Sequence, residues 1–566
     1  MKNFNFSAKD YTLRDVIWSN DTFRIPRYQR PYSWELGKAE ELWEDIFVNA
    51  DTFFLGSFIF NRDKEDKRVE VIDGQQRIIT ITIICAVLRD IAKQLGLEVA
   101  KSIQDNCIQG SFLGSDLKLM CGDSINNFFN RYIQTYPKID FPEEKSLSKE
   151  EKLVVKNYEY FKKEINEYIG NSPEKEKAIL EIIDILGDLK IIKIEITDEN
   201  YAYDIFETVN ARGTVLAPSD LLKNLVLKNV RDDGEKDSAK ELWSDIEENT
   251  GDDIKQFVRY YWLSKHEFVT SKGLYKKIKE KIEDYDKFLE SLYFFSDYYR
   301  LLTSAEKSDW SSFEDGDKIY HSLQGIHAMG ITQCNVLFLS LLEHRKKLPV
   351  RLYKWFEMIE NFSFNYFAIG KQPGNKIEKL YSQVAIDIWN AASETNEGRR
   401  EKKLNLIYED LKNKLRKELP VQESFSKNFG EIKYKNSESN RILLKYILSK
   451  LEKNIAGKEL SLDFDEISIE HLLPQKPAAE WKLSRDDIRD YVDSIGNLTI
   501  ISQTLNGKLG NEIMQKKVGL LRSSKISMTS NLSDYIEKNG FKWDREEIEK
   551  RVEDLKKEAF ETWAIK

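Results

Sequence analysis

Two short β-rich segments in an otherwise helical chain constrain the fold more than any other feature of the sequence. The first contains an apolar run at 53–60, a polar turn and a second apolar run at 68–73, a pattern typical of a β-hairpin. The second covers 467–502, and an alternating run at 189–197 predicts a strand that can join the hairpin. We therefore predict a predominantly α chain with small α+β islands.

The remaining segments predict helices. The apolar segment 78–95 is rich in β-branched residues, which favour strands, but its length and polar end favour a helix. From about 153 to 456 helical periodicity dominates. Because 566 residues exceed what one hydrophobic core usually supports, we predict three domains. Their boundaries are 1–225, 226–420 for a helical domain, and 421–566.

The composition is that of a folded protein, with 41% hydrophobic and 32% charged residues. The N-terminal residues lack the apolar core of a secretory signal, and no run of about 18 uncharged apolar residues occurs, so we expect no membrane partner. The four cysteines show no CxxC spacing, which favours neither a disulfide framework nor a zinc ribbon. A reducing cytoplasmic location is the expectation.

The charge distribution allows one local basic surface. The net charge of −9 argues against a protein that coats nucleic acid through its overall charge. Residues 501–530, however, carry five basic side chains against the single acid Glu512, a local net charge of +4. This stretch is either a phosphate-facing surface or an ordinary solvated helix face. The five basic residues are Lys508, Lys516, Lys517, Arg522 and Lys525.

The segment "VIDGQQRIIT" places Asp73 and Gly74 at a strand-to-helix junction, with Gln75, Gln76 and Arg77 in the first helical turn. Backbone N–H groups at a helix start lack intrahelical partners and attract anions such as phosphate. Arg77 would add a bidentate phosphate donor. The alternative is purely structural, because Asp73 three residues before Gln76 is a capping-box pattern. No Walker A string occurs.

Two further stretches are dense in groups that a nucleotide could use. Residues 24–35 interleave cations suited to phosphate with aromatic rings suited to a base. Residues 206–224 end a helix near Asn210, turn through Gly213 and restart a helix. Each stretch alone is better explained by packing or capping than by a site. The interleaved residues of the first stretch are Arg24, Arg27, Arg30, Tyr28, Tyr32 and Trp34.

Taken in order, "IPRYQRPYSW", "DGQQR" and "FETVNARG" resemble the N-terminal domain of the GmrSD-type modification-dependent restriction enzymes, whose fold is similar to ParB and sulfiredoxin. Where that family usually continues with "LTT", this chain has Ile78, Ile79 and Thr80. The resemblance implies binding and hydrolysis of a nucleoside triphosphate, either ATP, GTP or UTP. The implied nucleotide-binding residues are Asp73, Gly74, Gln75, Gln76, Arg77, Arg30, Tyr28, Asn210 and Arg212.

The stretch "ISIEHLLPQKPAAEW" holds His471, one of only five histidines in the chain. A histidine can take a proton from water near neutral pH, and a neighbouring divalent cation can stabilise charge at a phosphate. Alternation along a strand puts Glu470 and His471 on opposite sides, so joint use requires a twist or loop where Pro474 ends the strand. A lone histidine is otherwise a surface or core residue.

Downstream, "IGNLTIISQTLNGKLGN" predicts a short strand from Asn497 and then a turn or helix that carries Asn506. This order resembles the ββα-metal, or HNH, nuclease motif in the version found in the GmrSD C-terminal domain. The resemblance implies His471 as general base and Asn497 as the residue that orients its loop or imidazole. It further implies Glu470 and Asn506 as ligands of one Mg²⁺ or Mn²⁺ ion, because oxygen ligands favour hard cations.

Together the two resemblances imply an NTP-regulated, metal-dependent endonuclease that cleaves modified double-stranded phage DNA in bacterial defence. Lys508, Lys516 and Lys517 would then contact DNA phosphates. The alternative is a nucleotide-switched DNA-binding regulator whose C-terminal domain does not cut. The sequence leaves open whether the protein forms a homodimer and whether a nucleotide activates or inhibits cleavage.

Overall fold

The computed structural model describes most of the chain, and the described residues fall into two compact units. The first unit comprises Met1–Trp243 with Tyr275–Leu289, and the second comprises Ser244–Leu274 with Glu290–Lys566. The predicted three-domain division stays a prediction. The described residues are 6–26, 29, 31–47, 54–62, 68–110, 116–170, 172–196, 218–230, 238–304, 306–456 and 466–566.

A six-stranded mixed sheet forms the centre of the first unit, in the order β1-β8-β3-β4-β2-β7. The predicted hairpin is confirmed, since β3 and β4 pair antiparallel. The predicted strand at 189–197 joins it as β8, parallel to β3 and antiparallel to β1. The strands of this sheet are β1 (Phe6–Thr12), β2 (Phe23–Arg24), β3 (Phe54–Asn61), β4 (Val69–Asp73), β7 (Leu119–Met120) and β8 (Lys190–Ile196).

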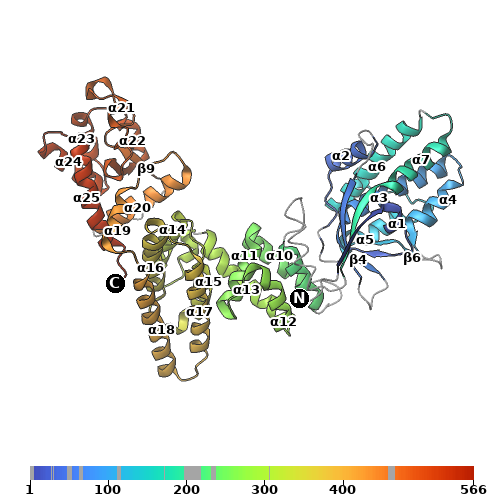
Figure 1. Ribbon diagram of the computed structural model, residues 1–566, viewed down its shortest axis with the longest axis horizontal. Coiled ribbons are helices and arrows are strands. Elements are labelled where there is room, and N and C mark those ends of the chain that lie inside the picture. Colours follow the sequence, from blue (N-terminus) through green and yellow to red (C-terminus); the bar gives the residue numbers. More distant parts are fainter. Residues whose placement is uncertain are drawn as a thin grey trace. The chain divides into compact units, whose positions relative to one another are not determined.

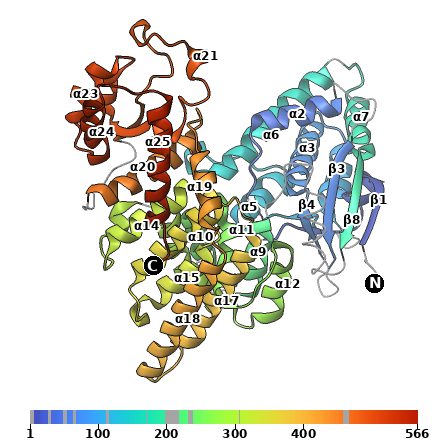
Figure 2. The ribbon, with the colours of Figure 1, turned by 60° about the vertical axis from the view of Figure 1, so that its left-hand side comes forward.

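Helix α3 (Gln75–Gln94) is the buried helix of this unit, and it confirms the prediction of a helix over 78–95. Nearly every position from Gln75 to Ala92 is buried, as expected for a helix that is apolar on all sides. Figure 2 shows α3 beside α6 and the strands. The neighbouring helices are α1 (Leu13–Val16), α2 (Leu36–Phe47), α4 (Val99–Ile103), α5 (Asp123–Phe129), α6 (Lys149–Gly170) and α7 (Lys175–Asp188).

The middle of the chain is helical, as predicted. None of the helices in the described ranges is long and apolar enough to cross a membrane. The helices are α9 (Pro218–Asn229), α10 (Ser238–Thr250), α11 (Ile254–Lys265), α12 (Ser271–Lys281), α13 (Tyr285–Ser304), α14 (Gly316–Ala328), α15 (Asn335–His344), α16 (Leu352–Ser363), α17 (Asn375–Ala392) and α18 (Glu397–Lys417).

The C-terminal segment packs on this helical body through a shared apolar core. The ring of Phe364 stacks on that of Trp563 with centroids 3.9 Å apart, and the Trp563 indole donates to the Tyr446 hydroxyl at 2.7 Å. Figure 1 shows β9 among the surrounding helices. The elements are α19 (Gln422–Gly430), α20 (Glu438–Ala456), β9 (Ile467–His471), α21 (Arg485–Ile488), β10 (Leu498–Ser502), α22 (Gln503–Leu509), α23 (Met514–Arg522), α24 (Ser527–Lys538) and α25 (Arg545–Thr562).

The predominantly α layout with small α+β islands is therefore confirmed.

Candidate functional site

The second β-rich segment folds as two antiparallel strands followed by a helix. β9 and β10 pair so that His471 lies opposite Leu498 and Glu470 lies opposite Thr499. β9 ends at His471, and α22 follows β10 directly and packs against β9. The predicted order of strand, loop, strand and helix is confirmed, with Glu470 and His471 on β9 and Asn506 on α22.

The imidazole of His471 is held by Asp493 from the loop before β10. Its Nε2 atom lies 3.1 Å from Asp493 Oδ1, and the side chain is 12% exposed. Because an ionised carboxylate only accepts hydrogen bonds, Nε2 carries the proton of the neutral ring and Nδ1 keeps a lone pair. The Tyr434 ring packs edge-on against the imidazole, with centroids 4.8 Å apart. Nδ1 is therefore the basic atom of the site.

Asp493 is a site residue that the sequence analysis missed. Gln475 Nε2 donates to the same Oδ1 atom at 2.6 Å. The hydrogen bond from His471 lowers the pKa of the Asp493 carboxyl below its ordinary value, so the group is ionised at neutral pH. The sequence feature that could have indicated this role is the position of Asp493 three residues before Gly496.

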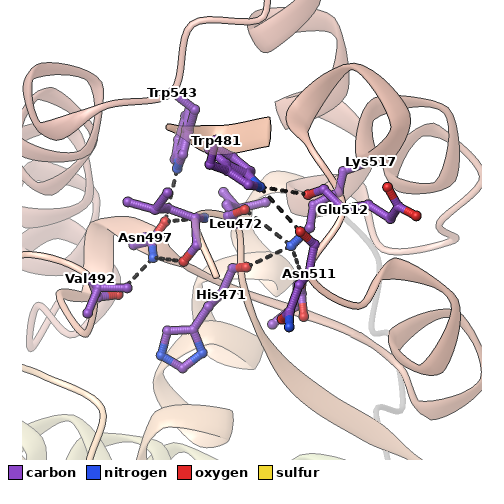
Figure 3. A network of polar contacts seen from close by, with 11 residues as sticks. His471, Leu472, Trp481, Val492, Asn497, Asn511, Glu512, Lys517 and Trp543 are labelled. Atoms are coloured by element: carbon purple, nitrogen blue, oxygen red, sulfur yellow. Dashed lines mark hydrogen bonds and ion pairs between the residues drawn. The ribbon is translucent and has the colours of Figure 1, made fainter. Parts of the chain in front are cut away.

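Glu470 is buried and paired with Lys517. Lys517 Nζ donates to Glu470 Oε1 at 2.6 Å and to the carbonyl oxygens of His471 and Leu472 at 3.1 and 3.2 Å (Figure 3). Burial raises the pKa of the Glu470 carboxyl, and it lowers the pKa of the Lys517 ammonium. The Lys517 side chain is 0% exposed, so the prediction of a phosphate contact at Lys517 is wrong. The positive charge of Lys517 instead balances the Glu470 carboxylate.

Asn497 is completely buried and fixes the loop that follows β9. Its Oδ1 accepts from the Leu473 amide at 2.8 Å and from the Trp543 indole at 2.9 Å. Its Nδ2 donates to the carbonyls of Leu473 and Val492 at 2.8 and 2.7 Å. These four bonds, drawn in Figure 3, satisfy the whole amide. Asn497 thus orients the loop, and none of its four bonds goes to the imidazole.

Helix α25 supports the turn that leads into β10. Arg551 donates to the carbonyls of Gly496 and Leu498 at 2.8 and 2.7 Å. A Cβ atom at Gly496 would lie 2.3 Å from the Ile548 carbonyl oxygen, a distance that requires glycine at this position. The glycine before Asn497 is therefore required by helix packing.

The remaining predicted residues of this site lie on the surface of α22 and α23. Asn506 is half-buried and Lys508 is exposed. Lys516 is exposed and pairs with Glu512 at 2.8 Å. Within the described ranges, no group of three or more His, Cys, Asp or Glu side chains is arranged to hold a metal ion. Any ion at the predicted position would have Glu470 and the Asn506 amide as its protein ligands.

At the N-terminal motif, Gly74 rather than Asp73 precedes the first helical residue. α3 begins at Gln75, as predicted, but its N-cap is Gly74 with φ of 96° and no side-chain cap. A Cβ atom at Gly74 would lie 2.3 Å from the Phe58 ring, so both the backbone angle and the space require glycine. The capping-box interpretation of Asp73 and Gln76 is therefore wrong.

The two glutamines around this motif tie a preceding loop to the start of α3. Gln76 accepts from the Ser33 amide at 2.9 Å and donates to the Pro31 carbonyl at 3.1 Å. Gln29 Nε2 donates to the Ile72 carbonyl at 2.9 Å. The stretches "IPRYQRPYSW" and "DGQQR", which are far apart in sequence, are thus neighbours in the fold.

Arg77 is bonded to β3. Its NH1 and NH2 groups donate to the carbonyls of Leu55 and Ser57 at 2.9 and 2.8 Å, and NH2 lies 3.4 Å from Asp73. The guanidinium also packs over the Phe58 ring at 4.5 Å. A phosphate would therefore have to replace bonds that Arg77 already makes.

The first aromatic stretch contributes mainly to the core. Tyr32 is 1% exposed and bonds Thr80 and Asn157, each at 2.8 Å, so the expectation of a base-stacking ring at Tyr32 is wrong. Burial raises the pKa of Tyr32 to about 12. Arg24 pairs with Glu70 at 2.6 Å. Four other predicted residues lie outside the described residues: Tyr28, Arg30, Asn210 and Arg212.

Comparison with known protein families identifies a domain at each end of the chain. Residues 13–227 match the N-terminal domain of the GmrSD restriction endonuclease, and residues 419–558 match the C-terminal domain of GmrSD restriction endonucleases. No curated protein matches the chain. The two matches define a restriction endonuclease, an enzyme that acts on DNA.

Between them, the two domain matches span well over half of the chain in the family's own order. The chain belongs to the GmrSD family of restriction endonucleases.

Proposed function

We propose that this restriction endonuclease cleaves DNA by metal-dependent phosphodiester hydrolysis at His471, as HNH nucleases do. One observation carries the proposal: the imidazole at the end of β9 is held through Nε2 by Asp493, in a strand–strand–helix unit whose strand β9 also carries Glu470 and whose helix α22 carries Asn506. Nδ1 of His471 would take a proton from the attacking water, and Asp493 would stabilise the imidazolium that results.

Glu470 and Asn506 would hold the Mg²⁺ or Mn²⁺ ion, because both offer the oxygen ligands that these cations prefer. Lys517 fixes one oxygen of Glu470 at 2.6 Å, so the carboxylate is already oriented. When bound, such an ion supplies charge stabilisation at the phosphate and the leaving oxygen.

The N-terminal residues Asp73 to Arg77 are proposed to bind and hydrolyse a nucleoside triphosphate, either ATP, GTP or UTP. The first-turn amides of α3 support this, since a helix start attracts phosphate. Arg77 would give up a hydrogen bond to the β3 backbone in order to bind a phosphate oxygen. Nucleotide binding would therefore change the contacts of β3. Tyr28, Arg30, Asn210 and Arg212 would complete the site, which would then regulate cleavage.

The proposed substrate is modified foreign DNA, such as that of phages, and the experiment compares matched phage DNAs. Plain, hydroxymethylated, glucosylated and phosphorothioated DNAs are incubated with Mg²⁺ or with EDTA, each with and without ATP, GTP or UTP. We expect cleavage of at least one modified DNA, its loss in EDTA, and a change in rate with one nucleotide. Binding without cleavage under every condition would favour the nucleotide-switched regulator. If no nucleotide changes the cleavage rate, the proposal of regulation is wrong, but the proposal of cleavage is not affected.

Replacing Asp493 with asparagine tests the positioning of the base. Loss of a carboxylate that orients a functional imidazole should lower the cleavage rate on the order of 10- to 100-fold. Removing the negative charge also disfavours the imidazolium, so the acidic limb of the pH–rate profile should move to lower pH. The pH–rate profile is measured for both proteins. A lower rate with an unmoved acidic limb would contradict positioning through charge and leave Asp493 a purely structural role.

A further inference from the structure

A polar pocket of about 790 Å³ lies beside His471. Two of its lining residues contact the imidazole directly: Asp493 holds Nε2 at 3.1 Å, and the Tyr434 ring packs against it at 4.8 Å. Gln475, which also lines the pocket, bonds Asp493 at 2.6 Å. Any occupant of this pocket would therefore contact the group that positions the proposed base.

Three cations line the pocket, against the two acids Asp486 and Asp493. Lys435, Arg485 and Arg489 line it and are exposed. Arg485 begins the short helix α21 and Arg489 is its C-cap. Because residues four apart on a helix are neighbours, the two arginines lie on the same side of α21. None of the three has an ion-pair partner within the part of the chain that the structure describes, whereas Lys516 is paired with Glu512 and Lys517 is buried against Glu470.

The short helix that presents the two arginines is well anchored. Ser484 and Asp487 form a capping box at its start, and Ile488 is completely buried. The positions of Arg485 and Arg489 are therefore set by the fold. Arginine is suited to phosphate because its planar fork donates two parallel hydrogen bonds to the oxygens.

We infer that this pocket binds the DNA backbone next to the cleaved phosphate, with Lys435, Arg485 and Arg489 on phosphate oxygens. This inference rests on the proposed function, since it takes DNA cut at His471 as the occupant. It assigns phosphate contacts to residues that the sequence analysis did not select, in place of the buried Lys517. The Tyr434 ring offers an apolar face to a sugar or base of the same strand.

The test is the double substitution Arg485→Gln and Arg489→Gln in the full chain. Both side chains are exposed, so glutamine removes charge without opening the core. Binding of a phage DNA duplex to the wild type and to the variant is measured in EDTA over a range of salt concentrations. Each lost phosphate contact reduces the slope of log K against log salt by about 0.9, so we expect a decrease of about 1.8.

A matched control replaces Arg399 and Lys402 on α18 with glutamine. Both are exposed, and α18 lies at the other end of the second unit from α21 (Figures 1 and 2). The control should keep the wild-type slope. An unchanged slope in the Arg485 and Arg489 variant, or an equal decrease in the control, would overturn the inference.

Hydrolysis of bis(p-nitrophenyl) phosphate separates this inference from the proposed function. The small diester needs the base and the metal but no DNA-binding surface, so the double variant should hydrolyse it at the wild-type rate. A reduced rate would overturn the inference by placing the two arginines in the chemistry. If the wild type hydrolyses neither the diester nor DNA, the nuclease proposal fails, while the binding slopes still decide whether the pocket holds DNA.

Discussion

Replacing His471 with alanine is expected to lower the rate of DNA cleavage by about 10² to 10⁴-fold, the usual contribution of a general base. The imidazole is bonded to Asp493 through Nε2, which leaves Nδ1 as its basic atom. Cleavage is measured in single-turnover assays so that chemistry, rather than product release, sets the rate.

DNA binding by this variant should match the wild type, whereas its thermal transition should lie lower, because a side chain only 12% exposed is removed from beside Asp493 and the Tyr434 ring. His321→Ala is the matched control, since His321 is a half-buried histidine on α14 and is expected to leave cleavage unchanged. Cleavage by His471→Ala at the wild-type rate would remove the basis for the HNH proposal.

Replacing Lys517 with alanine is expected to lower the free energy of unfolding by about 3 to 5 kcal/mol, because it leaves a buried carboxylate without its counter-charge. It also removes the donor to the carbonyls of His471 and Leu472. The measurement is urea unfolding followed by tryptophan fluorescence, to which the buried Trp543 and Trp563 of the C-terminal segment contribute.

The neighbouring lysine provides the control. Lys516 is 62% exposed and pairs with Glu512 on the surface, so Lys516→Ala should leave the free energy of unfolding nearly unchanged. The double variant Glu470→Gln with Lys517→Met should recover part of the loss, because it removes both charges. Equal stability of the Lys516→Ala and Lys517→Ala variants would show that the buried pair does not stabilise this fold.

Much of the proposed nuclease site was predictable from the sequence because its residues lie in two short segments. His471 and Glu470 end one strand, and the next strand begins directly after Asn497. Local periodicity and turn residues are sufficient to place such neighbours. The role of Asn497 in orienting the loop follows from the same resemblance, and the four bonds of its amide agree with that role.

The contacts that the sequence analysis missed join residues that are far apart in the sequence. Lys517 reaches Glu470 over 47 positions, and Trp543 reaches Asn497 over 46. Neither pair has a periodic spacing that would reveal it. The basic stretch at 501–530 was therefore interpreted from charge alone, and that interpretation could not distinguish exposed Lys516 from buried Lys517.

At both motifs, local elements were predictable from the sequence and long-range contacts were not. The sequence alone determined the elements: the hairpin of β3 and β4, the helix that begins at Gln75, and the strand–strand–helix order around His471. Such elements follow from local periodicity and backbone preference. Only the tertiary structure decided that Gly74 faces the Phe58 ring and that Asp493 holds His471, because burial and pairing depend on segments that meet only in the folded chain.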